Sequence, residues 1–164
     1  MPSRIFSSLA GALLAWTLST PLQAQSADSN VVSVEPAANL VLRRGAETDL
    51  PIKIVIRPGY HINSNMPAEE YLIPTALRWS RSSIGGITLR GVTYPQAEVV
   101  NYEFAEKPMQ VFSGTITVLS RFIVTSDTIK GQTRLQGTLR YQACTDRMCL
   151  APRTLPVSVP VAVE

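Results

Sequence analysis

Short runs of alternating apolar and polar residues recur along the chain from Gln25 onward, and they restrict its fold more than any other feature. Successive side chains of a β-strand point to opposite faces, so this alternation is typical of strands that are buried on one side. No stretch after Gln25 repeats its apolar residues at helical spacing over three turns. The sequence therefore predicts an all-β protein.

The clearest predicted strands are each bounded by Gly, Pro, Asn or Ser. They are Leu50–Ile56, Thr75–Trp79, Gly86–Val92, Gly114–Val124, Thr133–Tyr141 and Leu155–Val163. Weaker patterns at Val31–Ser33 and Leu40–Leu42 raise the number to about seven or eight, which is typical of a two-sheet sandwich with Greek-key connections. We expect an immunoglobulin-like β-sandwich. Pro156 and Pro160 cannot donate ladder hydrogen bonds, so the last strand should lie at a sheet edge or be only partly paired.

Two connections are longer than ordinary hairpin turns, namely Pro58–Pro74 and Pro95–Pro108. Loops of this length in a compact domain are usually functional or mobile. The sequence contains no internal repeat, no low-complexity tract and no sign of a second domain. We therefore expect one domain over residues 25–164 in which these two loops are candidates for function.

The first 24 residues have the order of a secretory signal peptide. Arg4 precedes the apolar run Ile5–Leu18, and small and polar residues then lead to Ala24. A membrane anchor needs about 20 apolar residues, which is more than this run provides. We expect cleavage after Ala24 and export of residues 25–164, after a short leader Gln25–Asn30, to an oxidising compartment.

The charge distribution excludes some classes of partner. The chain has 15 Lys and Arg against 12 Asp and Glu, and removing Arg4 with the first segment leaves 14 against 12, a net charge of +2. Arg43 and Arg44 stand alone as a basic pair, and no window is dominated by Lys and Arg. Nucleic acids and anionic membrane surfaces are recognised by basic patches, so neither is an expected partner.

Cys144 and Cys149 are the only cysteines, and they stand in the segment YQACTDRMCLAP, residues 141–152. If the flanking residues pair as antiparallel neighbours, the two Cα atoms come within the roughly 4.4–6.8 Å that a disulfide requires. In an exported protein such a pair is most often a structural staple. So short a loop contributes only about 2 kcal/mol, however, and a bond in a polar turn is accessible to an attacking thiolate. Spacing and composition leave the structural and the redox role open.

Other kinds of site have weaker support. A structural zinc site needs four nitrogen or sulfur ligands, whereas the chain has two Cys and one His. A copper(I) site built from the cysteines with Met148 and Met66 or Met109 is not supported by any Met-rich repeat. The chain has no Ser, His and Asp set that we can place at a site and no Gly-rich phosphate loop. We therefore expect no metal, no cofactor and no ordinary hydrolase chemistry.

Three blocks of the sequence resemble the N-terminal periplasmic domain of the bacterial thiol:disulfide interchange protein DsbD, often called the alpha domain. The strongest is Tyr141–Pro152, which is similar to that family's redox motif of an aromatic residue, Gln, a small residue, two Cys around a short polar loop, and Pro. The second is Gly59–Ser64 followed by Leu72–Thr75. The third is Asn101–Lys107, which resembles the cap loop of the family.

The resemblance implies an immunoglobulin-like periplasmic domain whose two cysteines cycle between dithiol and disulfide. In the family, the reduced domain passes electrons to disulfide isomerases and cytochrome c maturation thioredoxins, and a thioredoxin-like domain of the membrane protein reduces it. By position, Cys149 would form the mixed disulfide and Cys144 would resolve it. Phe104 would cap the disulfide, and the other interpretation is that it anchors its loop on the core. The remaining site residues would shape the cap loop or line the site floor: Glu103, Ala105, Tyr60, His61 and Asn63.

The sequence departs from the family in two respects. It ends at Glu164 without the membrane domain or the thioredoxin-like domain, so we expect either a separate, membrane-linked electron donor or a different exchange. His61 and Asn63 stand where the family often has tyrosines, and we interpret His61 as a loop histidine with ordinary hydrogen bonds. The sequence thus predicts a cofactor-free thiol:disulfide carrier or reductant that acts between thioredoxin-fold partners and has no small-molecule substrate. The alternative is a non-enzymatic adaptor with a structural hairpin disulfide.

Overall fold

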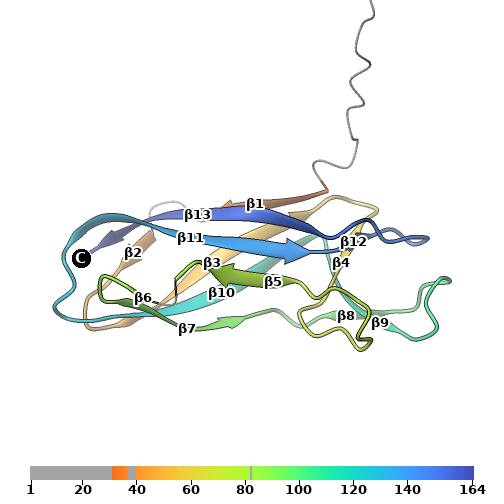
Figure 1. Ribbon diagram of the computed structural model, residues 1–164, viewed down its shortest axis with the longest axis horizontal. Helices are drawn as coiled ribbons and strands as arrows, with labels where there is room; N and C mark the ends of the chain where they lie inside the picture. The colour runs from red at the N-terminus through yellow and green to blue at the C-terminus, as the bar shows by residue number, and fades with distance from the viewer. Residues whose placement is uncertain (1–30, 37–39, 82) are drawn as a thin grey trace, which may run out of the picture.

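The computed structural model describes residues 31–36, 40–81 and 83–164, so the expected signal peptide and leader lie outside the described residues. The regular secondary structure in these ranges is entirely β-strand. Two long sheets lie face to face, and a small third sheet lies at one end of them (Figure 1). Within the same ranges, no helix is long and apolar enough to cross a membrane. The prediction of an all-β, immunoglobulin-like sandwich is confirmed.

The first long sheet has the strand order β1-β3-β10-β7-β6, and the second has the order β2-β13-β11-β5. The first sheet consists of β1 (Val32–Pro36), β3 (Glu47–Ile56), β10 (Thr115–Val124), β7 (Ile87–Thr93) and β6 (Ser83–Ile84). The second consists of β2 (Leu40–Leu42), β13 (Arg153–Val163), β11 (Gly131–Tyr141) and β5 (Ala76–Trp79). All six strands that the sequence predicted most clearly are present, although their ends differ by up to three residues.

The main core lies between the two long sheets because each sheet turns alternate side chains inward. β3 and β10 show the same alternation of exposed and buried positions, and Ile52, Ile54 and Val118 have no exposed surface. These side chains belong to one cluster with Leu139 of β11 and Val159 of β13 from the facing sheet. Burying one side chain of this size contributes about 1.5–3 kcal/mol. The sandwich therefore has an apolar core of its own, to which the cysteine-bearing end is attached.

The last strand, β13, is only partly paired, as its prolines predicted. β11 pairs with β13 along its whole length, whereas β2 reaches only Val161–Val163 on the other side. Pro156 and Pro160 therefore lie in the part of β13 that has one neighbouring strand. A proline nitrogen that faces the open side of a strand leaves no ladder hydrogen bond unmade.

The third sheet was not predicted from the sequence. Its strand order is β12-β4-β9-β8, with β12 (Ala143–Cys144), β4 (His61–Asn63), β9 (Met109–Ser113) and β8 (Glu98–Val100). β4 and β8 lie inside the two long connections, which are therefore not irregular throughout. β4 has only three residues and is buried at all of them, so it lacks the alternation of buried and exposed positions that marks the longer strands.

Gly114 joins the third sheet to the sandwich. It separates β9 from β10 and has a φ of 60°, a left-handed conformation that glycine adopts without steric cost. Its carbonyl accepts a hydrogen bond from the backbone N–H of Ile56, at the end of β3, with an N···O distance of 2.7 Å. The chain passes at this residue from one sheet into the next, so the third sheet is held against the end of the sandwich.

Candidate active site

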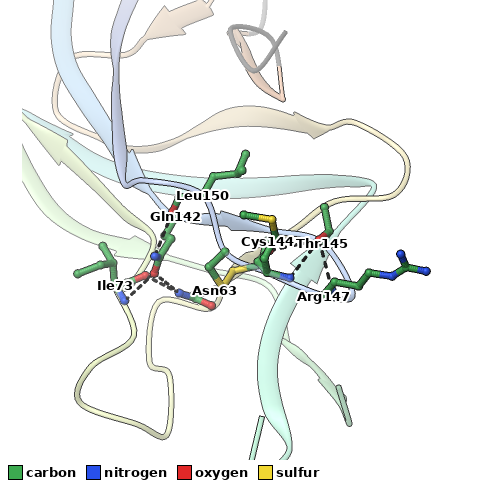
Figure 2. The surroundings of a disulfide bond; sticks show 9 residues. Asn63, Ile73, Gln142, Cys144, Thr145, Arg147 and Leu150 are labelled. Atoms are coloured by element: carbon green, nitrogen blue, oxygen red, sulfur yellow. Dashed lines mark hydrogen bonds between the residues drawn. A yellow bond between two sulfur atoms is a disulfide. The ribbon is translucent and has the colours of Figure 1, made fainter. Parts of the chain in front are cut away.

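The two cysteines form a disulfide in a short hairpin, residues 143–150 (Figure 2). β12 ends at Cys144, and Cys149 lies opposite it as an isolated antiparallel bridge. The hydrogen bonds of this hairpin lie on either side of the bridge, including one from Leu150 N to Ala143 O at 2.8 Å. The cysteines are thus a non-hydrogen-bonded pair, the kind in which facing Cα atoms approach most closely. Their Cα atoms are 3.9 Å apart, which is closer than the range expected from the sequence.

The turn between the cysteines is closed by Thr145. Its backbone N–H donates to Met148 O at 2.8 Å. Its hydroxyl oxygen accepts hydrogen bonds from the backbone N–H groups of Arg147 and Met148, at 3.3 and 3.2 Å, and Figure 2 shows this group of contacts beside the disulfide. None of these bonds involves sulfur. The hairpin should therefore keep its shape when the disulfide opens.

We expect the reduced protein to stay folded at room temperature. The disulfide joins residues separated by 5 positions and contributes about 2 kcal/mol, whereas whole domains are stable by roughly 5–15 kcal/mol. Circular dichroism of the oxidised and reduced forms should agree, and the urea midpoint of the reduced form should be moderately lower. The double variant Cys144→Ser/Cys149→Ser controls for effects of the free thiols. Unfolding of the reduced form would instead indicate a structural staple.

Gln142 connects the hairpin to its surroundings through three hydrogen bonds (Figure 2). Its side-chain N–H donates to Leu150 O at 3.1 Å, on the other arm of the hairpin. Its side-chain oxygen accepts from Ile73 N at 3.4 Å and from the Asn63 amide at 3.3 Å. One side chain therefore holds the hairpin against β4 and against the loop that precedes β5. Gln142 belongs to the motif around the cysteines, but its place in the sequence predicted no role for it.

His61 and Asn63 lie on one face of β4, beside the hairpin. β4 runs between β12 and β9, and the strand register places His61 opposite Cys144. Paired residues of neighbouring strands point to the same face, with Cβ atoms about 4.5–5.5 Å apart. His61 and Asn63 are 4% and 0% exposed. The interpretation of His61 as a loop histidine with ordinary hydrogen bonds is wrong, because it lies on a buried strand and its Nε2 has no partner among the described residues.

Burial lowers the pKa of His61 below its ordinary value of 6.5, because the charged imidazolium is disfavoured away from water. Two carboxylates oppose this shift, Asp146 in the hairpin and Glu98 in β8. Glu98 also accepts a hydrogen bond from the Ser113 hydroxyl, with an O···O distance of 2.6 Å. His61 is therefore a neutral, buried base at neutral pH.

We expect the oxidised protein to lose stability as the pH falls through the ordinary histidine pKa. The unfolded chain binds a proton at His61 more readily than the folded chain, so the free energy of unfolding decreases with falling pH in this window. His61 is the only histidine, and Asp49 and Asp127 have pKa values below the ordinary 3.8. The urea midpoint of the wild type should be lower at about pH 5 than at about pH 7. In His61→Gln this difference between the two midpoints should be much smaller. An equal difference in both proteins would contradict this assignment.

Three rings stack outward from β4 towards the surface. Tyr102 stacks on the His61 imidazole with centroids 4.3 Å apart, and on Phe104 with centroids 5.6 Å apart. Phe104 is 40% exposed and, together with Cys149, lines a pocket of about 230 Å³. The other lining residues are Tyr71, Leu72, Ala105, Met109 and Gln142. Phe104 therefore lies at a pocket beside the hairpin and is not a buried core residue.

The cap loop, residues 101–107, is linked to the loop before β5 by an ion pair. Lys107 Nζ lies 2.7 Å from Glu69 Oε1. Within the cap loop, Ala105 N donates to Tyr102 O at 3.0 Å, and Glu103 is exposed. An exposed ion pair contributes only about 0–1 kcal/mol. The ion pair is thus a minor contribution, and the loop is held mainly by Tyr102 and Ala105, which pack against the buried cluster of Leu72, Met109 and Val111.

The contacts of Tyr60 lie elsewhere. Its ring packs against the main core cluster and beneath the guanidinium of Arg57, which is 4.7 Å from the ring centroid. Successive residues of an extended chain point to opposite sides, so Tyr60 and His61 diverge. The expected place of Tyr60 on the site floor finds no support in these contacts. Tyr102 contacts His61 instead, although the sequence indicated it only as one member of the segment Asn101–Lys107.

The site has no obvious set of metal ligands. Among the residues that the structure describes, no three His, Cys, Asp or Glu side chains are grouped so that they could hold a metal ion. Of the methionines considered for copper, Met66 and Met148 are exposed, whereas Met109 is buried in a small second cluster.

Comparison with known proteins identifies a family. A family model described as "Thiol:disulfide interchange protein DsbD, N-terminal" matches residues 28–160. The chain belongs to this family. The resemblance inferred from three sequence blocks is therefore confirmed, and the family is one of thiol:disulfide interchange domains. No curated protein sequence matches the chain.

Two solved structures are similar to this DsbD-type domain. One is the N-terminal domain of Neisseria meningitidis DsbD in the reduced form, with 15% identity, a TM-score of 0.46, and 70% of this chain and 78% of that chain covered. The other is the N-terminal periplasmic domain of ScsB from Proteus mirabilis, with 13% identity, a TM-score of 0.53, and 82% of this chain and 47% of that chain covered. The chain thus spans about half the length of the ScsB domain and shares its fold.

Proposed function

We propose that this DsbD-type domain is a periplasmic thiol:disulfide carrier that passes electrons between thioredoxin-fold partners through Cys144 and Cys149. One observation carries the proposal. The hairpin buries Cys144 and leaves Cys149 half-buried at the edge of a pocket, so one sulfur is open to a partner and the other is protected. Export with cleavage after Ala24 brings such a domain to the periplasm, where its partners act.

The unequal exposure of the two cysteines supports a different step for each of them. The Cys149 thiolate attacks a partner disulfide, forms a mixed disulfide and displaces one partner thiolate. Cys144 then attacks Cys149, the internal disulfide forms, and the second partner sulfur leaves as a thiolate. Two electrons have passed to the partner, and no cofactor takes part. The reverse sequence, with a membrane-linked dithiol donor, reduces the domain again.

The partner docks on apolar side chains around Cys149. Tyr71, Phe104 and Met148 are 69%, 40% and 59% exposed. Tyr71 and Phe104 line the same pocket as Cys149, and Met148 precedes Cys149 in the hairpin. Exposed apolar patches commonly mark protein interfaces. We propose that thioredoxin-fold proteins of the disulfide isomerase and cytochrome c maturation types bind this surface. The electron donor binds the same surface at another stage of the cycle.

A measured reduction potential distinguishes this function from a non-enzymatic adaptor with a structural disulfide. The mature protein is equilibrated in thiol buffers of graded potential, and alkylation of the free thiols gives the reduced fraction. Exchange proteins have potentials between about −270 and −120 mV, whereas structural disulfides lie below about −300 mV. A value in the first range supports the carrier function. A value below about −300 mV would show that the hairpin disulfide is structural.

A further inference from the structure

Two buried side-chain atoms lack a hydrogen-bond partner within the described part of the chain, and both belong to β4. They are Nε2 of His61 and Oδ1 of Asn63, on the face of β4 that the register sets beside Cys144. A buried polar atom left without a partner destabilises the folded protein, and a redox or catalytic role is one recognised reason for keeping one. A disulfide carries no proton, so the oxidised hairpin has no S–H group to donate to these atoms.

We propose that His61 is the general base that takes the thiol proton of Cys144 when the domain resolves a mixed disulfide. This inference rests on the proposed function. In the mixed disulfide Cys144 is a thiol, and a thiol donates a hydrogen bond to an unpartnered imidazole nitrogen. The attacking species is the thiolate, so this proton must leave first. Cys144 has no exposed surface, and of the two unpartnered atoms on this face only Nε2 of His61, the residue opposite Cys144 in the register, is a base.

The resolving step moves one proton and one electron pair. The Cys144 proton passes to Nε2 of His61, and the thiolate attacks Sγ of Cys149. The bond between Cys144 and Cys149 forms as the bond between Cys149 and the partner sulfur breaks. The partner sulfur leaves with the electron pair as a thiolate, and the His61 imidazolium then releases its proton to water. His61 is neutral again and the domain is oxidised.

The groups packed around His61 suit this role. Burial holds its pKa below the ordinary range, so Nε2 is free to accept a proton at neutral pH. Asp146 from the hairpin and Glu98 from β8 supply negative charge that favours the imidazolium formed during the step. β9 contributes Ser113, which is uncharged, and the cap loop contributes Tyr102, whose pKa is raised by burial and which therefore stays neutral. β12 contributes the thiol itself.

The reduced mature protein is mixed with dithiobis(nitrobenzoate) in a stopped-flow instrument. This reaction separates the attack by Cys149 from the resolution by Cys144. The first coloured thiolate appears when Cys149 forms the mixed disulfide, and the second appears when Cys144 resolves it. His61→Phe keeps a ring stacked on Tyr102 without a nitrogen, and His61→Gln keeps a polar group that is not a base. We expect the second phase to slow by about tenfold or more in both variants, with the first phase unchanged. Tyr60→Phe, one residue away with its ring against the core, is the matched control and should behave as the wild type.

The pH dependence distinguishes a base from a structural residue. In the wild type the second phase should accelerate as His61 loses its proton and then level off, whereas in the variants it should keep rising towards the ordinary thiol pKa of about 8.5. A second phase equal to that of the wild type at every pH overturns the proposal, and so does an equal slowing of both phases. If His61→Phe fails to fold, His61→Gln carries the test. The probe is a small disulfide, so failure of the carrier function would appear separately, as failure to trap a protein partner.

Discussion

Reduced Cys144→Ser protein is expected to remain covalently attached to thioredoxin-fold partners when it is added to an oxidised periplasmic extract. Cys149 keeps its half-exposed position as the attacking thiolate. Without the second thiol, the mixed disulfide has no internal route to release, so a transient intermediate becomes a stable product. Non-reducing electrophoresis followed by mass spectrometry of the shifted bands measures the trapped species, which the wild type should scarcely accumulate.

Cys149→Ser is the matched control because it keeps one thiol at the buried position. We expect it to trap much less partner, since Cys144 has no exposed surface. The double serine variant should trap nothing, which shows that the shifted bands require a sulfur of this domain. If neither single variant captures a thioredoxin-fold protein, the carrier function is rejected and the adaptor with a structural disulfide remains.

Phe104→Ala is expected to accelerate reduction of the disulfide by glutathione. Phe104 stacks on Tyr102 and lines the pocket that contains Cys149, so its ring restricts the approach of a small thiol. Removing the ring should raise the rate by about threefold to tenfold, equivalent to lowering the barrier by about 0.7–1.4 kcal/mol. The free energy of unfolding should fall by only about 1 kcal/mol, because the ring is already 40% exposed. Reduction kinetics and urea midpoints give both quantities.

Ile129→Ala provides the control for loss of an exposed apolar side chain. Ile129 is 88% exposed and lines a pocket with Val163, at the end of β13 that is far from the hairpin. Its removal should leave the reduction rate unchanged. A different result for Phe104→Ala, with unchanged kinetics and a stability loss of about 3–5 kcal/mol, would place Phe104 in the core and remove the cap from the mechanism.

The strands of the sandwich could be predicted because each long strand buries one face and exposes the other. In β3 and β10 this produces a local period of two, which can be read without knowledge of the neighbouring strands. β4 has three residues, which are too few to establish such a period, and its polar residues are buried with the apolar one between β12 and β9. The strand that carries His61 and Asn63 was therefore interpreted as part of a loop.

The sequence by itself determined the all-β class, the family and the cysteine pair, because these depend on local alternation and on a short motif. Only the tertiary structure decided that His61 faces Cys144, and that Tyr102 lies between His61 and Phe104. These neighbours come from separate segments, and the register of β4 with β12 brings two of them together. A shift of that register by one residue would turn His61 to the opposite face. Whether a buried polar atom finds a partner is likewise a result of packing between distant segments, and no local pattern of residues specifies it.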